Sequence, residues 1–77
     1  MEELVGFAAS NHKASKILAV LDSKGSLDRS VISKTIRIVG ADKCLDELVE
    51  KKLIIQDGEK FSLTDTGKEV CHKLRGV

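Results

Sequence analysis

The side chains best suited to chemistry in this chain are two histidines and two cysteines. His12 and His72 have no carboxylate or cysteine at the spacing of a metal-ligand motif. Cys71, next to His72, could meet Cys44 in a folded chain and so form a metal site. Both cysteines fall on apolar stripes typical of helices, however, and they form no Cys-x-x-Cys motif. We therefore expect buried free thiols, no disulfide, no metal and no cofactor.

The spacing of the other polar residues is not typical of a catalytic centre. The chain has no glycine-rich phosphate loop, no nucleophile elbow and no pair of carboxylates with complementary roles. Its 77 residues fit one domain, and a core of this size leaves little room for a deep substrate cleft. With 42% hydrophobic and 32% charged residues, the composition is that of a folded globular protein. We expect a single domain over residues 1–77 that is not an enzyme.

Charge is distributed unevenly along the chain, although the formal net charge is only +1. Residues 13–37 carry six lysines and arginines against two acids, whereas residues 42–69 carry eight acids against five lysines. A nucleic acid would have to be recognised by a local cluster of cations, because the protein as a whole hardly attracts phosphates. Phe7 and Phe61 are the only aromatic residues, which argues against a stacking platform for single strands.

The beginning of the chain bears on where the protein works. Residues Met1 to Val5 lack the basic start and the long apolar run of a signal peptide. No segment approaches the ~18 consecutive apolar residues that a membrane-spanning helix requires. We expect a cytoplasmic protein that makes no contact with a membrane.

Helical periodicity and capping residues divide the first part of the chain into four helices. We expect a short N-terminal helix over residues 1–9 and a three-helix core over residues 11–52. Ser10 or Asn11 can cap the first core helix, and Asp28 can cap the second. The third core helix has the clearest apolar stripe, formed by Ala41, Cys44, Leu45, Leu48 and Val49.

Residues 53–63 have the pattern of a β-hairpin. Two extended runs flank Asp57-Gly58, a dipeptide that favours the positive backbone angles of a type I′ turn. Thr64 can then cap a last helix over residues 64–75. Together with a very short extended segment at Ser26-Leu27, these elements predict a mainly helical α+β domain.

This order of elements, together with three sequence segments, resembles the winged helix-turn-helix domain of bacterial and archaeal transcription regulators. The segments are Leu27-Asp28-x-x-x-Ile32-x-x-x-Ile36, Leu45-x-x-Leu48-Val49-Glu50-Lys51-Lys52-Leu53-Ile54 and Phe61-Ser62-Leu63-Thr64-Asp65-Thr66-Gly67-Lys68-Glu69-Val70. They are similar to the family's entry into its second helix, its recognition helix running into the wing, and its exit from the wing. Lys52 stands where the family often has glycine, and residues 38–45 are shorter than the usual path into the recognition helix. The resemblance implies a three-helix core, a two- or three-stranded wing sheet and a C-terminal helix.

The resemblance also implies a regulator of transcription that binds duplex DNA, with the third core helix in the major groove. On this interpretation Lys34, Arg37 and Lys43 are the best phosphate contacts, and Lys60 in the wing is a weaker one. Asp42 or Asp46 could accept a hydrogen bond from the amino group of cytosine. The expected DNA-binding residues are Arg29, Lys34, Arg37, Asp42, Lys43 and Lys60.

The acids of the third core helix leave a second interpretation open. Asp42, Asp46, Glu47 and Glu50 lie opposite its apolar stripe, where they would repel the phosphates of a duplex. The alternative is a winged-helix adaptor that binds a basic protein partner through this face and does not bind nucleic acid.

A DNA-binding protein of this size is also expected to form a homodimer, because two copies double the number of phosphate contacts. The terminal helices would supply the dimer interface. Its candidate residues are Leu4, Val5, Phe7, Val70 and Leu74.

Overall fold

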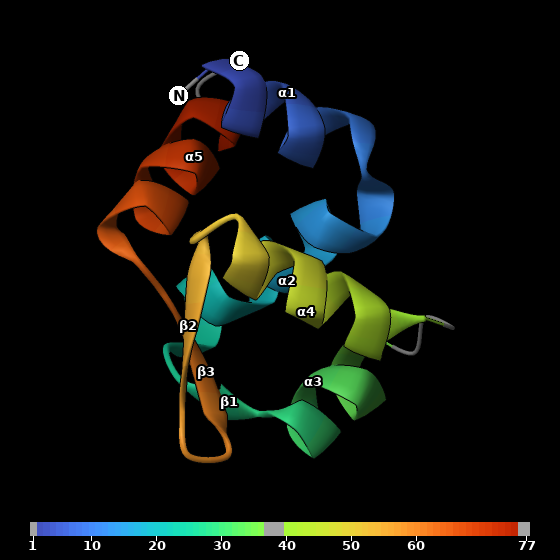
Figure 1. Ribbon diagram of the computed structural model, residues 1–77. Helices are drawn as coiled ribbons and strands as arrows, with labels where there is room; N and C mark the ends of the chain where they lie inside the picture. Colours follow the sequence, from blue (N-terminus) through green and yellow to red (C-terminus); the bar gives the residue numbers. More distant parts are fainter. Residues whose placement is uncertain (1, 37–39, 76–77) are drawn as a thin grey trace.

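The computed structural model describes residues 2–36 and 40–75, and this part of the chain forms five helices and three strands. Their order is α1 (Glu2–Ser10), α2 (His12–Lys24), β1 (Leu27–Asp28), α3 (Arg29–Ile36), α4 (Ala41–Glu50), β2 (Ile54–Asp57), β3 (Lys60–Leu63) and α5 (Asp65–Arg75). In Figure 1, α1 and α5 lie together at one end of the molecule, and the β2–β3 hairpin points towards the other. The expected mainly helical α+β domain is confirmed. None of the helices described is both long enough and apolar enough to cross a membrane.

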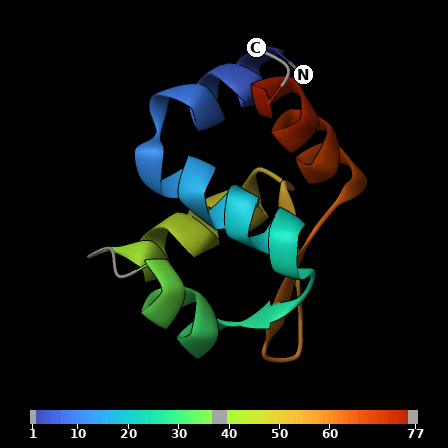
Figure 2. The same cartoon turned by 180° about the vertical axis from the view of Figure 1, so that it is seen from behind.

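The boundaries of α2 follow from the residues at its two ends. Of the two caps expected, Asn11 is the one used: its side chain accepts a hydrogen bond from the Ala14 N–H group at 3.1 Å. At the other end Gly25 has a φ of 89°, and its N–H group donates to the Leu21 carbonyl at 2.8 Å. Figure 2 shows α2 crossing the middle of the molecule, where it packs against α1, α4 and α5.

One hydrophobic cluster holds the helices and the sheet together. Its fully buried side chains include Ile17, Leu18, Leu21, Ile32, Leu45, Leu48, Leu53, Ile54, Phe61 and Val70. Cys44 and Cys71 lie in the same cluster as free thiols. Their burial raises the pKa of both thiols, because the thiolate is poorly solvated there. The expectation of buried free cysteines is confirmed.

The sheet is antiparallel, with β3 in the centre between β1 and β2. Asp57 pairs with Lys60, so Gly58 and Glu59 form the centre of the hairpin turn. The turn predicted at Asp57-Gly58 was therefore wrong by one residue. Gly58 has a positive φ of 64° and Glu59 does not, which is the pattern of a type II′ turn with glycine at its first central position.

Candidate functional site

Helix α4 packs against α3 on one side and against β2 on the other, so its outer face is framed by both (Figure 1). Cys44, Leu45 and Leu48 bury the inner face of the helix in the core. The exposed residues of α4 are Asp42, Lys43, Asp46, Glu47 and Glu50. The outer face of α4 is therefore acidic, with a single lysine in its first turn.

Arg29, the first residue of α3, crosses to the outer face of α4 and bridges two of these acids. Its Nη1 atom lies 3.0 Å from an oxygen of Asp42, and its Nη2 atom lies 3.4 Å from an oxygen of Asp46. The two aspartates are one helical turn apart, so one guanidinium can reach both. The same guanidinium stacks on the Phe61 ring of β3, 5.1 Å from the ring centroid. Arg29 thus ties α3, α4 and β3 together at one point.

The two aspartates also act on the charge of Arg29. Hydrogen bonding to Asp42, with a smaller contribution from Asp46, raises the pKa of Arg29 above its already high ordinary value. The guanidinium is therefore charged at neutral pH. Its charge offsets part of the negative charge on the outer face of α4.

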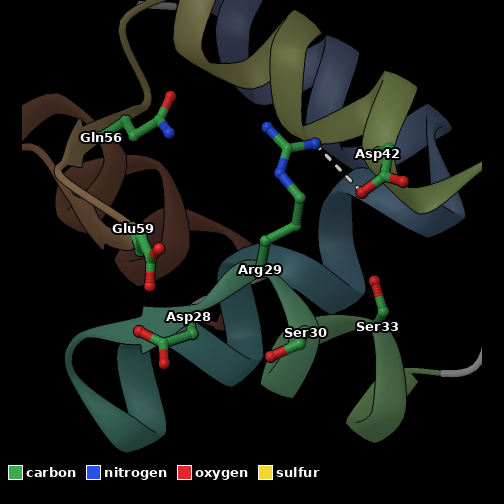
Figure 3. A pocket seen from close by; sticks show the side chains of 7 residues that line it. All are labelled: Asp28, Arg29, Ser30, Ser33, Asp42, Gln56 and Glu59. Atoms are coloured by element: carbon green, nitrogen blue, oxygen red, sulfur yellow. Dashed lines mark hydrogen bonds and ion pairs between the residues drawn. The ribbon is translucent and has the colours of Figure 1, made fainter.

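A shallow hollow of about 540 Å³ lies between α3, α4 and the β2–β3 hairpin. It is lined by Asp28, Arg29, Ser30, Ser33, Asp42, Gln56 and Glu59 (Figure 3). Three carboxylates, one guanidinium, two hydroxyls and one amide can donate or accept hydrogen bonds there. The described part of the chain brings together no group of three or more histidines, cysteines and acids that could hold a metal ion. The hollow is suited to a charged, hydrogen-bonding partner.

The other described DNA-binding candidates, Lys34, Lys43 and Lys60, are not among the residues that line this hollow. Lys34 near the end of α3 and Lys43 in the first turn of α4 are both exposed. Lys60 is exposed as well, but its cross-strand neighbours are Asp57 on one side and Asp28 on the other. Those carboxylates offset its charge. Of the three lysines, Lys60 is therefore expected to attract a phosphate least. Arg37 lies outside the described residues.

Several residues of the hollow were not expected from the sequence. Ser30 and Ser33 are three residues apart on α3, and this helical spacing is a signal that could have grouped them. Gln56 and Glu59 enter the hollow from the hairpin, and only the fold of the sheet brings them near α3. The contact between Arg29 and Phe61 depends on strand register in the same way.

The terminal surface expected to form a dimer interface is largely used inside one copy of the chain. Val70 has an exposed fraction of 0%, so it cannot reach a second copy, and its place among the interface candidates is corrected. Leu4, Val5, Phe7 and Leu74 are only partly buried and pack against the core. The Nζ atom of Lys51 lies 4.6 Å from the centroid of the Phe7 ring, on the side of α1 that faces the end of α4.

No protein-family model, no curated protein and no solved structure matches the chain. A function for the chain therefore has to be argued from its own residues and their geometry.

Proposed function

We propose that this chain is a winged helix-turn-helix module that binds duplex DNA and regulates transcription, with α4 as its recognition helix. The order of α2, β1, α3, α4, β2 and β3, with β3 between the other two strands, supports the winged-helix architecture. Helix α4 has an outer face that is not covered by any other described element, and the hairpin beside it is the equivalent of a wing.

The observation that carries the proposal is the ion pairing of Arg29 with Asp42 and Asp46. Asp42 and Asp46 both lie on the first two turns of α4, where a recognition helix approaches the bases and phosphates. Pairing with one guanidinium reduces their repulsion of a duplex. Arg29 therefore supports DNA binding by offsetting acids on α4, and phosphate contact falls to Lys34 and Lys43.

Binding through so few cations is expected to be weak and strongly dependent on salt. Each lysine that neutralises a phosphate releases counterions, and the affinity falls with salt in proportion to the number of such contacts. Glu47 and Glu50 on α4 are not among the acids that Arg29 pairs with, and their charge reduces the affinity further. Measurements therefore need low salt to detect the complex.

The experiment is a fluorescence-anisotropy titration of a labelled random-sequence duplex at ~50 mM and ~200 mM salt. The proposal expects binding at the lower salt that weakens at the higher one. Lys34→Ala and Lys43→Ala should each weaken it. Lys73→Ala removes the same charge from an exposed site on α5 and serves as the matched control. Equal effects of all three variants would mean that only net charge matters and that α4 is not the contact surface.

A second set of variants separates the two possible roles of Arg29. Arg29→Ala should weaken duplex binding, because it leaves Asp42 and Asp46 unpaired beside the phosphates. The triple variant Arg29→Ala/Asp42→Asn/Asp46→Asn should restore binding to at least the original level if Arg29 acts by neutralising the acids. Persistent weak binding in the triple variant would identify Arg29 as a direct DNA contact.

The hollow favours a second candidate function, an adaptor that binds a basic segment of another protein and does not bind nucleic acid. Asp28, Asp42 and Glu59 line it, and Arg29 is the one cation among its lining residues. A lysine or arginine of a partner could pair with these carboxylates. Absence of duplex binding at ~50 mM salt, with binding of a lysine- and arginine-rich peptide that Glu59→Gln weakens, would favour the adaptor.

A further inference from the structure

Strand β2 forms one edge of the sheet, because the strand order is β1-β3-β2. The Thr64 N–H group donates to the Leu53 carbonyl at 3.1 Å, which sets the alternation of backbone groups along the strand. The Leu53 carbonyl and the backbone groups of Ile55 and Asp57 face β3, whereas the Leu53 N–H group donates to the Leu48 carbonyl at 3.0 Å. The N–H and C=O groups of Ile54 and Gln56 consequently point away from the sheet, and none of the described residues bonds to them.

The side chain at the middle of this edge is apolar and exposed. Ile55 has an exposed fraction of 50%, and in the described part of the chain only Val31, at 40%, is a comparably exposed large hydrophobic residue. A hollow of about 570 Å³ lies beside the edge, and Val49, Ile54 and Thr66 are among its lining residues. Exposed strand edges usually carry charge or are covered, since they otherwise pair with another strand. Here the centre of the edge has neither protection.

The two ends of β2 have opposite charge. Lys51 and Lys52 precede the strand and outnumber Glu50, whereas Asp57 and Glu59 at its far end outnumber Lys60. A second copy of β2 running antiparallel would bring the lysine end of each strand to the acidic end of the other. A parallel copy would place like charges together. The charges of the edge are therefore complementary to the same edge of a second copy in the antiparallel direction.

We propose that two copies of this chain associate through β2, antiparallel, across a two-fold axis at Ile55. In this register Ile54 of each copy forms a hydrogen-bonded pair with Gln56 of the other, so the four outward backbone groups of each edge are satisfied. The two Ile55 residues face each other as a non-hydrogen-bonded pair, the arrangement that brings opposite side chains closest. The three-stranded sheets join into one sheet of six strands. The pairing closes with two copies, because the same surface is used by both.

The dimer is expected to be weak, since a four-residue strand buries less surface than a standard protein interface. Sedimentation velocity over ~10 µM to ~1 mM should show a monomer–dimer equilibrium within that range. Ile55→Lys places two like charges on the two-fold axis and should raise the dissociation constant by about tenfold or more. Val31→Lys makes the same substitution at the other exposed aliphatic site, on α3, and should leave it unchanged. Circular dichroism checks that both variants are folded.

Two further pairs of variants test the direction and register of the pairing. Lys52→Glu should weaken the dimer, and Lys52→Glu/Glu59→Lys should restore it, because the charges then complement each other again. Ile55→Cys should form a disulfide-linked dimer under mild oxidation, since the proposed pair lies within disulfide reach, whereas Val31→Cys should not. A protein that stays monomeric up to ~1 mM, a dimer unaffected by Ile55→Lys, or equal cross-linking of the two cysteine variants would each overturn the proposal. None of these outcomes depends on whether the protein binds DNA.

Discussion

The backbone of Gly67 in the first turn of α5 lies directly against the carbonyl group of Leu53, and a Cβ atom on Gly67 would overlap the carbonyl oxygen. Thr64 holds the two segments close together, because its hydroxyl group makes a hydrogen bond to each of them. Its hydroxyl oxygen accepts a hydrogen bond from the Gly67 N–H group at 2.9 Å and lies 2.7 Å from the Lys52 carbonyl, to which it donates. The small residue and the cap together hold α5 on the segment that leads from α4 into β2.

Gly67→Ala should destabilise the fold by about 2 kcal/mol or more, because either the helix or the Leu53 backbone must move. Gly6→Ala is the matched control: Gly6 is also helical, but nothing lies within 4 Å of its added Cβ. That variant should gain up to about 1 kcal/mol from improved helix propensity. Urea unfolding followed by circular dichroism measures both changes. Similar effects of the two substitutions would show that the Leu53 carbonyl does not restrict position 67.

Thr64→Val keeps the shape of the side chain but removes the hydroxyl, so the Gly67 N–H group loses its partner. Loss of an N-cap of this kind costs about 1 kcal/mol, and up to about 2 kcal/mol when the hydroxyl has a second bond to lose. Thr64→Ser retains the hydroxyl and should recover most of the stability. Thr66→Val alters a neighbouring threonine that does not cap α5. We expect the unfolding free energy of Thr64→Ser to exceed that of Thr64→Val. Thr66→Val should have an unfolding free energy close to that of the original protein.

Lys52 has a φ of 62°, in the left-handed region that favours glycine. Lys52→Gly should therefore stabilise the protein by about 1 kcal/mol, whereas Lys52→Ala retains the unfavourable φ and should not. Both variants remove the same side-chain charge, so the difference between their unfolding free energies isolates the backbone. It should be measured at low micromolar concentration, where self-association does not contribute.

Features that depend on a few neighbouring residues were predictable from the sequence. Asn11 was one of two caps named for α2, and Thr64 was named as the cap of α5. The hairpin was placed correctly, but its turn was not. When the turn moves by one residue, each residue of β2 pairs with a residue two positions further along β3. Side chains alternate between the faces of a sheet, so a shift of two leaves the same side chains on each face. The hydrophobic pattern around Phe61 and Leu63 fits both registers, so it could not choose between them.

The candidate site was less predictable because its contacts join distant parts of the chain. Arg29 was expected among the DNA contacts, and Asp42 among the base-reading residues. In the structure these two side chains pair with each other across 13 residues of sequence. That pairing follows from how α3 packs on α4 and from the register that sets Phe61 beneath the guanidinium. Neither the packing of α3 on α4 nor the strand register can be predicted from the spacing of charged residues alone.

The buried thiols predict a loss of stability at alkaline pH. Burial, with a smaller effect of Glu47, raises the pKa of Cys44, and burial raises the pKa of Cys71. The unfolded chain therefore loses these two protons first as the pH rises. The stability that the neutral thiols contribute is complete below about pH 8.5 and falls above it, by up to about 1.4 kcal/mol per pH unit for each thiol.

Urea unfolding between pH 7.5 and 10 should show this decline, and Cys44→Ala/Cys71→Ala should flatten it even though the cavities lower the stability at every pH. A decline of the same slope in the double variant would assign it to other groups, and rapid reaction of the native thiols with an aromatic disulfide at pH 8 would contradict their burial.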